Sequence, residues 1–194
     1  MADSCLLNDA VAFAAEAHKG QCRKGSDIPY IVHPMEAASI CASLTDDQEV
    51  LAAAVLHDVV EDTDATIGQV ATLFGERVAR LVAGESEDKM EHLPAADTWK
   101  ARKVESIERL READDPAVRM ICLGDKLSNI RSMQRDLEAL GDALWDRFNQ
   151  KDPAEHGWYY RTISEVLEEG LGDTDAWKEY DRRVDAVFPR KACD

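Results

Sequence analysis

The stretch LAAAVLHDVVEDT, residues 51–63, begins as an uninterrupted apolar run and ends as an acidic cluster. The run contains neither Gly nor Pro, which predicts a buried helical segment. It leads directly into His57 and Asp58, and Glu61 and Asp62 follow. If the helix continues, Glu61 lies one turn beyond His57, and Asp62 lies one turn beyond Asp58. The pattern therefore predicts three carboxylates crowded onto the end of an apolar helix.

Two interpretations of this acidic cluster are open. Like charges one turn apart destabilise a helix by about 0.2–0.5 kcal/mol per pair, a cost that a solvated helix end tolerates. A bound cation would instead turn the repulsion into attraction. His57 directly abuts the apolar run, and imidazole and carboxylate groups together are typical ligands of transition-metal ions. The histidine therefore favours a metal site.

Length and composition favour a single all-α domain. At 194 residues the chain can bury most of its surface in one core. Hydrophobic residues make up 45% of the chain and aromatic residues only 6%, which favours closely packed helices over a sheet. We predict one bundle of about ten helices spanning residues 1–194. Its catalytic core is expected at residues 6–140, with C-terminal helices at residues 142–188 packing on that core.

Charge, termini and cysteines narrow the choice of partners. The formal net charge of −16 argues against non-specific binding to nucleic acid or anionic lipid. No apolar run approaches the length of a membrane span, and the N-terminus lacks the basic start of a secretion signal. The five cysteines are scattered without a CxxC pair: Cys5, Cys22, Cys41, Cys122 and Cys193. We therefore expect free thiols, a cytoplasmic location, and neither nucleic acid nor membrane as a partner.

Capping residues predict where the helices begin. Pro34 suits the first position of a helix, which places His33 at the N-cap or just before it. The longest polar stretch, residues 84–96, predicts a surface loop. Other predicted helix starts are Asp46 or Asp47, Thr66 with Gln69 in capping-box spacing, Asp97 or Thr98, Asp115, Asp152 and Thr174.

Several aromatic residues are expected to serve packing or to lie at the surface. Tyr159 and Tyr160 are expected to pack in the core rather than to stack on a base. His18, His92 and His156 have no partners at ligand spacing, so we expect them at the surface.

A further candidate ligand lies in the segment CLGDKLSNIRSM, residues 122–133. Asp125 interrupts an otherwise apolar stretch, so its carboxylate is expected near the interior. A lone charge there is costly unless a metal or a hydrogen-bonded partner neutralises it. Gly124 costs a helix about 1 kcal/mol relative to Ala, which indicates a close backbone approach at this position. Asn129 lies one turn beyond Asp125 on the same helix face.

His33, the His57–Asp58 doublet and Asp125 together supply two imidazoles and two carboxylates. This set is too hard for a structural zinc site of the thiolate type. It suits Mn(II), Fe(II), Co(II) or catalytic Zn(II), with coordination positions left open for water.

Six ordered blocks carry a more specific resemblance. They are RKGSDIPYIVHP (23–34), LAAAVLHDVVEDTDAT (51–66), FGERVARLV (74–82), SEDK (86–89), WKARK (99–103) and GDKLSNIRSM (124–133). The H…HD…D pattern resembles the HD superfamily of metal-dependent phosphohydrolases. The full set strongly resembles the hydrolase domain of the RelA/SpoT family over residues 10–133. In size the chain is similar to the free-standing small alarmone hydrolases.

The resemblance implies an all-helical HD fold with one Mn(II) per chain, held by His33, His57, Asp58 and Asp125. Zn(II), Fe(II) or Co(II) are alternative metals. It also implies hydrolysis of guanosine 3′,5′-bis(diphosphate) at its 3′-pyrophosphate, which yields GDP or GTP and pyrophosphate. No synthetase or regulatory domain fits in the remaining residues, so the family's second activity is expected to be absent.

The resemblance also implies roles for residues around the metal. The family's acidic pair falls on Glu61 and Asp62, which would help to activate the attacking water; the alternative is that they only orient the metal ligands. Arg23 falls where the family packs an arginine against the guanine base, with Lys24 as a neighbouring substrate contact. On composition alone, these two residues form a solvated loop pair. Asn129 falls in the block that lines the ribose and phosphate side.

Three functions are open at this point. The leading hypothesis is a Mn-dependent alarmone 3′-pyrophosphohydrolase. A related HD phosphohydrolase would act on another nucleotide, such as the 2′-phosphate of NADPH or a nucleoside monophosphate. A non-catalytic sensor would bind a nucleotide without turnover, but the presence of Glu61 and Asp62 argues against it. Each hypothesis takes a small-molecule nucleotide as partner and leaves the oligomeric state open.

Overall fold

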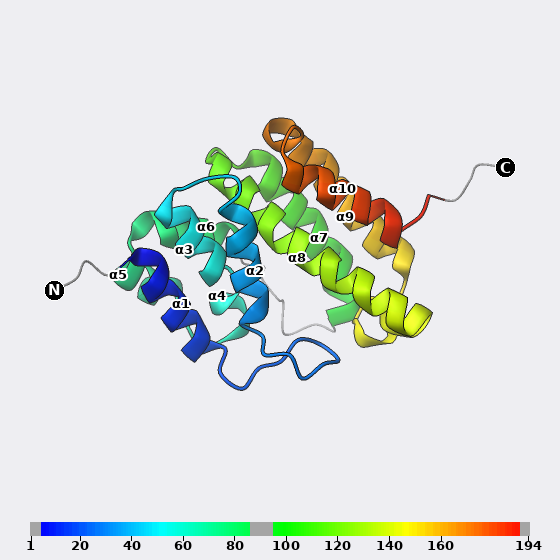
Figure 1. The fold of residues 1–194 in the computed structure, drawn as a ribbon, viewed down its shortest axis with the longest axis horizontal. Coiled ribbons are helices and arrows are strands. Elements are labelled where there is room, and N and C mark those ends of the chain that lie inside the picture. Colours follow the sequence, from blue (N-terminus) through cyan, green and yellow to red (C-terminus); the bar gives the residue numbers. More distant parts are fainter. Residues whose placement is uncertain (1–4, 86–94, 191–194) are drawn as a thin grey trace. The chain divides into compact units, whose positions relative to one another are not determined.

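The computed structural model describes residues 5–85 and 95–190. Within these ranges the chain forms ten α-helices and one 3-10 helix, and its β-type pairing is a single isolated bridge between Cys22 and Pro29 (Figure 1). The elements are α1 (Leu6–Ala17), α2 (Val32–Cys41), α3 (Gln48–Leu56), α4 (Val59–Asp62), α5 (Ile67–Phe74), α6 (Glu76–Glu85), α7 (Ala95–Glu112), α8 (Pro116–Leu140), η1 (Gly141–Arg147), α9 (Pro153–Leu171) and α10 (Asp175–Val187). The predicted all-α fold is therefore confirmed. None of the described helices is both long and apolar enough to cross a membrane.

The chain divides into two compact units. The first contains residues 1–87 and 113–125, and the second contains residues 88–112 and 126–194. The boundary falls within α8, directly after Asp125. All four candidate metal ligands belong to the first unit. The interpretation of residues 1–194 as one domain stays a prediction.

Helix α3 forms the centre of the first unit. Every residue from Val50 to Leu56 is buried, as expected for a helix that is apolar on all sides. Helices α1, α2 and α6 pack around it. The apolar run in the sequence is therefore a core helix, and it ends where the candidate metal site begins.

Most of the predicted helix starts are confirmed. The Asp47 carboxylate accepts a hydrogen bond from the Glu49 N–H and caps α3, and Thr66 forms a capping box with Gln69 at the start of α5. The carboxylates of Asp115 and Asp152 cap the starts of α8 and α9, and the hydroxyl of Thr174 caps the start of α10.

Two predicted boundaries between α6 and α7 are wrong. Helix α7 begins at Ala95, ahead of both predicted caps, because alanine has the highest helix propensity and extends the first turn backward. Helix α6 continues through Gly84 to Glu85, so the predicted loop at residues 84–96 is shorter at both ends. Residues 86–94, which include the SEDK block and His92, lie outside the described residues.

The close approach predicted at Gly124 is confirmed. A Cβ atom on Gly124 would lie 2.7 Å from the Ala37 carbonyl oxygen and 2.8 Å from the Cys41 Sγ. Both partners belong to α2, which also carries His33. Glycine therefore lets α8 approach α2 closely at the position next to Asp125.

We expect Gly124→Ala to lower the free energy of unfolding by about 1–3 kcal/mol, since the added methyl group meets backbone that cannot move aside. Ordinary helix propensity would instead raise stability by about 1 kcal/mol. The matched control is Gly68→Ala in α5, where a Cβ would meet only the Thr66 Oγ1 at 3.9 Å. Urea unfolding should show a loss for the first variant and no loss for the second. Equal stability of Gly124→Ala and wild type would contradict the close packing of α2 and α8.

Helix α9 supplies much of the core of the second unit. Tyr159 and Tyr160 are buried, so their predicted packing role is confirmed. His156 is also buried: its Nε2 lies 2.9 Å from the Gln150 carbonyl oxygen, and aromatic rings surround it. The predicted surface position of His156 is therefore wrong, as is that of His18, which is 3% exposed. Local spacing indicates whether a histidine has ligand partners, but its burial depends on residues distant in the chain.

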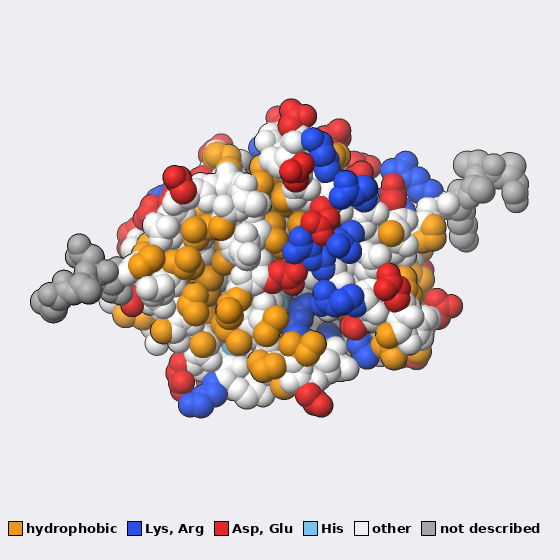
Figure 2. Space-filling view, viewed as in Figure 1, with side chains coloured by type: hydrophobic (Ala, Val, Ile, Leu, Met, Phe, Trp, Pro, Cys, Tyr) orange, Lys and Arg blue, Asp and Glu red, His pale blue; other side chains and the backbone are white. Residues whose placement is uncertain are grey.

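Glu179 on α10 is held by two arginines of the second unit. The Arg131 guanidinium donates hydrogen bonds to both carboxylate oxygens, at 2.8 and 2.7 Å, and Arg183 Nε donates a further one at 2.8 Å. Figure 2 shows Lys and Arg side chains gathering over α8 and α10 on the face viewed. The bonds from Arg131 are the largest cause that lowers the pKa of Glu179 to about 2.

Because this pKa is depressed in the folded chain, the stability from Glu179 is present above the ordinary glutamate pKa of 4.5. It is lost as the pH falls from there through about 2. We expect Glu179→Gln to cost about 1–2 kcal/mol at pH 7, allowing for solvent screening of a partly exposed pair. The difference from wild type in urea unfolding should shrink below pH 4.5. Glu138→Gln, at an exposed position of α8, is the control. A difference that does not change with pH would contradict the charge pairing.

Candidate metal centre

The His57–Asp58 doublet lies at a junction between two helices. Helix α3 ends at Leu56 and α4 begins at Val59, with His57 as the C-cap of the first and Asp58 as the N-cap of the second. The continuous helix considered from the sequence is therefore wrong at this point. Successive side chains of an unbroken helix diverge by about 100°. At the junction, His57 Nε2 and Asp58 Oδ2 instead lie 3.0 Å apart.

His33 lies in the first turn of α2 rather than at its N-cap. The helix begins at Val32, two residues before Pro34, with Ile31 as the N-cap. The predicted start was wrong because the loop already turns ahead of the helix. The Val32 and His33 N–H groups donate to the carbonyl oxygens of residues 29 and 30. Pro34 fits in the first turn because no intrahelical N–H bond is required there. The His33 side chain is buried, with 3% of the residue exposed.

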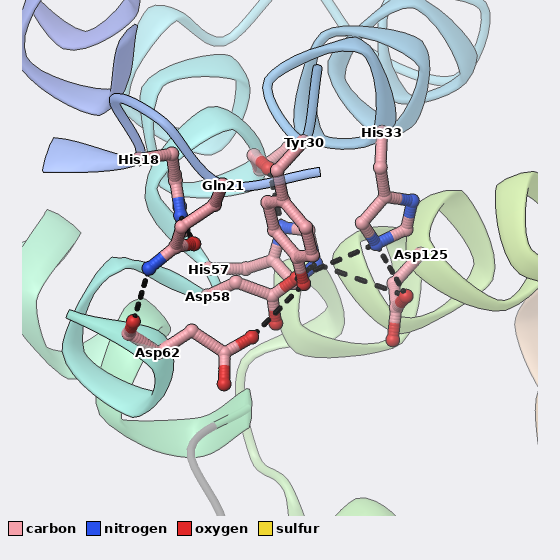
Figure 3. A network of polar contacts seen from close by, with 9 residues as sticks. His18, Gln21, Tyr30, His33, His57, Asp58, Asp62 and Asp125 are labelled. Atoms are coloured by element: carbon pink, nitrogen blue, oxygen red, sulfur yellow. Dashed lines mark hydrogen bonds and ion pairs between the residues drawn. The ribbon is translucent and has the colours of Figure 1, made fainter. Parts of the chain in front are cut away.

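Four side chains from three separated segments converge in the first unit (Figure 3). His33 Nε2 lies 3.1 Å from Asp125 Oδ1 and 3.4 Å from Asp58 Oδ2. His57 Nε2 lies 3.0 Å from Asp58 Oδ2 and 3.7 Å from Asp125 Oδ1. The ligand atoms of His33, His57 and Asp58 all lie within 4.8 Å of one another. Asp125 Oδ1 lies near the Nε2 atoms of both imidazoles.

The arrangement fits a divalent metal ion. His57 Nδ1 lies 2.8 Å from the Ala54 carbonyl oxygen, which can only accept, so Nδ1 carries the proton and Nε2 offers a lone pair. That Nε2 is buried and faces two carboxylate oxygens, Asp58 Oδ2 at 3.0 Å and Asp125 Oδ1 at 3.7 Å. Ligands about 2.1 Å from a shared ion lie roughly 3.0 Å apart at a right angle and roughly 3.4 Å apart in a tetrahedron. The four observed separations, from 3.0 to 3.7 Å, cover this range.

The electrostatics of the four side chains favour added positive charge. Burial alone would lower the pKa of His57, but the negative charges of Asp58 and Asp125 outweigh it and raise that pKa well above the ordinary range. Burial alone would raise the pKa of Asp58, but the positive charge of His57 and the contact with His33 hold it well below the ordinary range. Without a metal these charges favour a proton on His57 Nε2, and a divalent ion would take the place of that proton between the two carboxylates.

Tyr30 is a functional candidate that the sequence interpretation missed. Its hydroxyl lies 2.6 Å from Asp58 Oδ2 and 3.0 Å from Asp62 Oδ2, so it connects a candidate metal ligand with one of the predicted catalytic acids. Burial, followed by the charges of these two carboxylates, raises the pKa of Tyr30 above its ordinary range. In the sequence, Tyr30 stands out only as part of a short apolar entry to α2. No helical period joins it to residues 28 and 32 positions away.

The other predicted site residues are placed as follows. Glu61 and Asp62 are half-buried on α4, and the Asp62 carbonyl oxygen accepts a hydrogen bond from Gln21 Nε2 at 2.7 Å. Arg23 is half-buried, and its guanidinium carbon lies 5.7 Å from the centroid of the Tyr30 ring. Arg23 and Tyr30 therefore lie side by side in the segment before α2.

Lys24 is exposed in the first unit. Asn129 is half-buried one turn beyond Asp125 on α8, in the segment that belongs to the second unit. Their predicted substrate roles stay predictions.

Comparisons with known proteins point to one family. The HD domain family model matches residues 10–153. The chain is 38% identical over 135 residues to the guanosine-3′,5′-bis(diphosphate) 3′-pyrophosphohydrolase MESH1 of Danio rerio, covering 68% of this chain and 71% of that protein. It is 40% identical over 129 residues to the bifunctional (p)ppGpp synthase/hydrolase SpoT of Escherichia coli K12, which covers 66% of this chain. The chain spans only 18% of the length of SpoT and of a similar Aquifex aeolicus pyrophosphohydrolase.

Solved structures agree with the sequence relatives. A metazoan ortholog of SpoT that hydrolyzes ppGpp matches with a TM-score of 0.75 and 27% identity, covering 94% of this chain and 96% of that one. The protein lmo0812 from Listeria monocytogenes EGD-e matches with a TM-score of 0.70 and 31% identity, covering 84% of this chain and 97% of that one. By its sequence match, its helical architecture and its His–Asp cluster, the chain belongs to the HD domain family.

Proposed function

We propose that this protein is a Mn(II)-dependent guanosine-3′,5′-bis(diphosphate) 3′-pyrophosphohydrolase. One observation carries the proposal. In the first unit, the imidazole Nε2 atoms of His33 and His57 lie 3.0 to 3.7 Å from carboxylate oxygens of Asp58 and Asp125. The named activities of MESH1 and SpoT support the choice of substrate. The mixed imidazole and carboxylate donors support Mn(II), with Zn(II), Fe(II) and Co(II) as competing ions.

The four ligands and the acidic pair divide the chemistry between them. A divalent ion, when bound, lowers the pKa of a coordinated water from about 15.7 toward about 7 and offsets charge on the attacked phosphoryl group. Glu61 or Asp62, each on α4 next to the ligand doublet, accepts the proton of the attacking water. The water oxygen forms a bond to the phosphorus that is attached to the ribose 3′ oxygen. The bond between that phosphorus and the 3′ oxygen breaks. The proton taken from the water, returned through solvent to the leaving 3′ oxygen, completes release of GDP and pyrophosphate.

Arg23 and Lys24 are proposed to contact the substrate from the loop before α2, and Asn129 from α8. The position of Arg23 over the Tyr30 ring supports a flat, stacked environment for a base. The net charge of −16 makes such local cations important, because a polyanionic substrate is repelled by most of the surface.

A chromatographic assay tests the function. The metal-stripped protein is supplied with Mn(II) and either guanosine 3′,5′-bis(diphosphate) or NADPH, and products are separated by anion exchange. Release of pyrophosphate from the first substrate supports the proposal, and the metal-free sample should be inactive. Phosphate release from NADPH alone would favour the alternative phosphohydrolase. Binding of either nucleotide without product would favour a non-catalytic sensor.

We also propose a reducing, cytoplasmic location for this activity. Four cysteines of the described residues are free thiols: Cys5, Cys22, Cys41 and Cys122. Unpaired cysteines in this number favour a compartment that keeps thiols reduced. Nucleic acid and membranes are not proposed as partners, in keeping with the strongly negative charge.

A further inference from the structure

The hydroxyl of Tyr30 lies between two carboxylates that the proposed reaction uses differently. Asp58 is a candidate metal ligand, and Asp62 belongs to the acidic pair on α4. The hydroxyl is 2.6 Å from Asp58 Oδ2 and 3.0 Å from Asp62 Oδ2 (Figure 3). We propose that Tyr30 is a positioning residue, whose hydroxyl holds the Asp62 carboxylate at a set distance from the metal ligand Asp58. This inference rests on the proposed function and concerns the same site.

The hydrogen count at Tyr30 shows what the hydroxyl can do. A phenol has one hydrogen to donate, and its oxygen can accept one from another group. While both carboxylates are ionised, the single hydrogen is shared between Asp58 and Asp62 and separates two like charges. When Asp62 has accepted a proton, its new O–H can donate to the Tyr30 oxygen, while Tyr30 donates to Asp58. The same hydroxyl therefore holds Asp62 in place before and after a proton transfer.

Tyr30 is itself held on several sides. Its backbone N–H donates to the Gln21 carbonyl oxygen at 2.9 Å. Its ring lies 4.7 Å from the His18 ring and 5.9 Å, edge-on, from the His33 ring. These contacts fix the ring, so that the hydroxyl reaches the two carboxylates without an entropic cost at each turnover.

Gln21 ties the same loop to α4 by a separate route. Its Nε2 donates to the Asp62 carbonyl oxygen at 2.7 Å, and its Oε1 lies 2.9 Å from Nδ1 of the buried His18. Asp62 is thus held through its backbone by Gln21 and through its side chain by Tyr30. The two contacts restrain both the position of the end of α4 and the direction of the carboxylate.

The Tyr30→Phe variant removes the hydroxyl and keeps the ring with its contacts to His18, His33 and Arg23. We expect kcat to fall about 10–100-fold, and the Kd for Mn(II) to rise by a similar factor, because Asp58 loses the donor that orients it. KM should stay close to that of wild type, since the ring beside Arg23 remains. Mn(II) affinity is measured by electron paramagnetic resonance on the metal-stripped protein, without nucleotide.

Tyr180→Phe is the matched control. The Tyr180 hydroxyl is fully buried and donates to the Tyr160 carbonyl oxygen at 2.9 Å in the second unit. This variant loses a buried phenol hydrogen bond in the unit that does not contain the four ligands. It should keep the wild-type kcat and Mn(II) affinity, even if its melting temperature falls.

A double-mutant cycle separates positioning from a general structural role. If Tyr30 acts on the rate through Asp62, the Tyr30→Phe/Asp62→Asn variant at saturating Mn(II) has a kcat no lower than that of Asp62→Asn alone. Losses that multiply, or an unchanged Mn(II) affinity in Tyr30→Phe, would overturn the proposal. If wild type does not hydrolyse guanosine 3′,5′-bis(diphosphate), the proposed function fails, and the Mn(II) titration alone decides the role of Tyr30. A rise in Kd then supports it, and equal affinity overturns it.

Discussion

Asp125→Ala is expected to weaken Mn(II) binding by at least about a hundredfold and to abolish measurable turnover. Removing one partner of a buried charge cluster costs about 3–5 kcal/mol, and about 1.4 kcal/mol corresponds to a factor of ten in affinity. Asp125 Oδ1 lies 3.1 Å from His33 Nε2 and 3.7 Å from His57 Nε2. Its loss therefore removes a negative charge from beside two buried imidazoles. Metal content by mass spectrometry after dialysis and the chromatographic assay measure the two effects.

Two further variants make the Asp125 result specific. Asp125→Asn keeps the side-chain shape and removes the charge, so it should lose most of the affinity while remaining folded. Glu138→Ala removes a carboxylate from an exposed position of the same helix, where Gln134 Nε2 donates a hydrogen bond to Glu138 Oε1 at 3.1 Å. It should retain metal and activity. Full activity of metal-stripped Asp125→Ala would refute the ligand set.

Glu61→Gln is expected to retain Mn(II) and to lose about 10²–10⁴-fold in kcat, the range for removal of a general base. The amide keeps the size of the side chain and removes its ability to accept a proton. Glu61 is half-buried on α4, one residue before Asp62, which is held by Tyr30 and Gln21. The pH dependence of kcat and the Mn(II) affinity, measured together, separate loss of a base from loss of the metal.

Asp64→Asn is the control for charge on this segment, because Asp64 is exposed just beyond the end of α4. It changes the net charge by the same amount as Glu61→Gln and should leave kcat within about twofold of wild type. Near-normal turnover of Glu61→Gln would assign Glu61 to a structural role. The proton of the attacking water would then have to pass to Asp62.

Local chemistry was enough to predict most of the helix starts and to single out the four candidate metal ligands. The apolar run before His57 lies within α3, where every residue from Val50 to Leu56 is buried, and Asp47 and Thr66 cap helices where short-range hydrogen bonds predict them. The unusual Gly124 predicted a close approach, although not that Ala37 and Cys41 lie opposite it. The buried face and the caps depend on residues a few positions apart, whose geometry the backbone period largely determines.

The tertiary structure alone decided how the residues of the site meet. It broke the helix between His57 and Asp58, placed His33 inside α2, buried His18 and His156, and brought Tyr30 to Asp58 and Asp62. The sequence by itself determined which imidazoles and carboxylates are the candidates for the metal site, because residue type and local spacing follow from the chain. Their separations and burial were decided only by packing between segments far apart in the chain, which no local period describes.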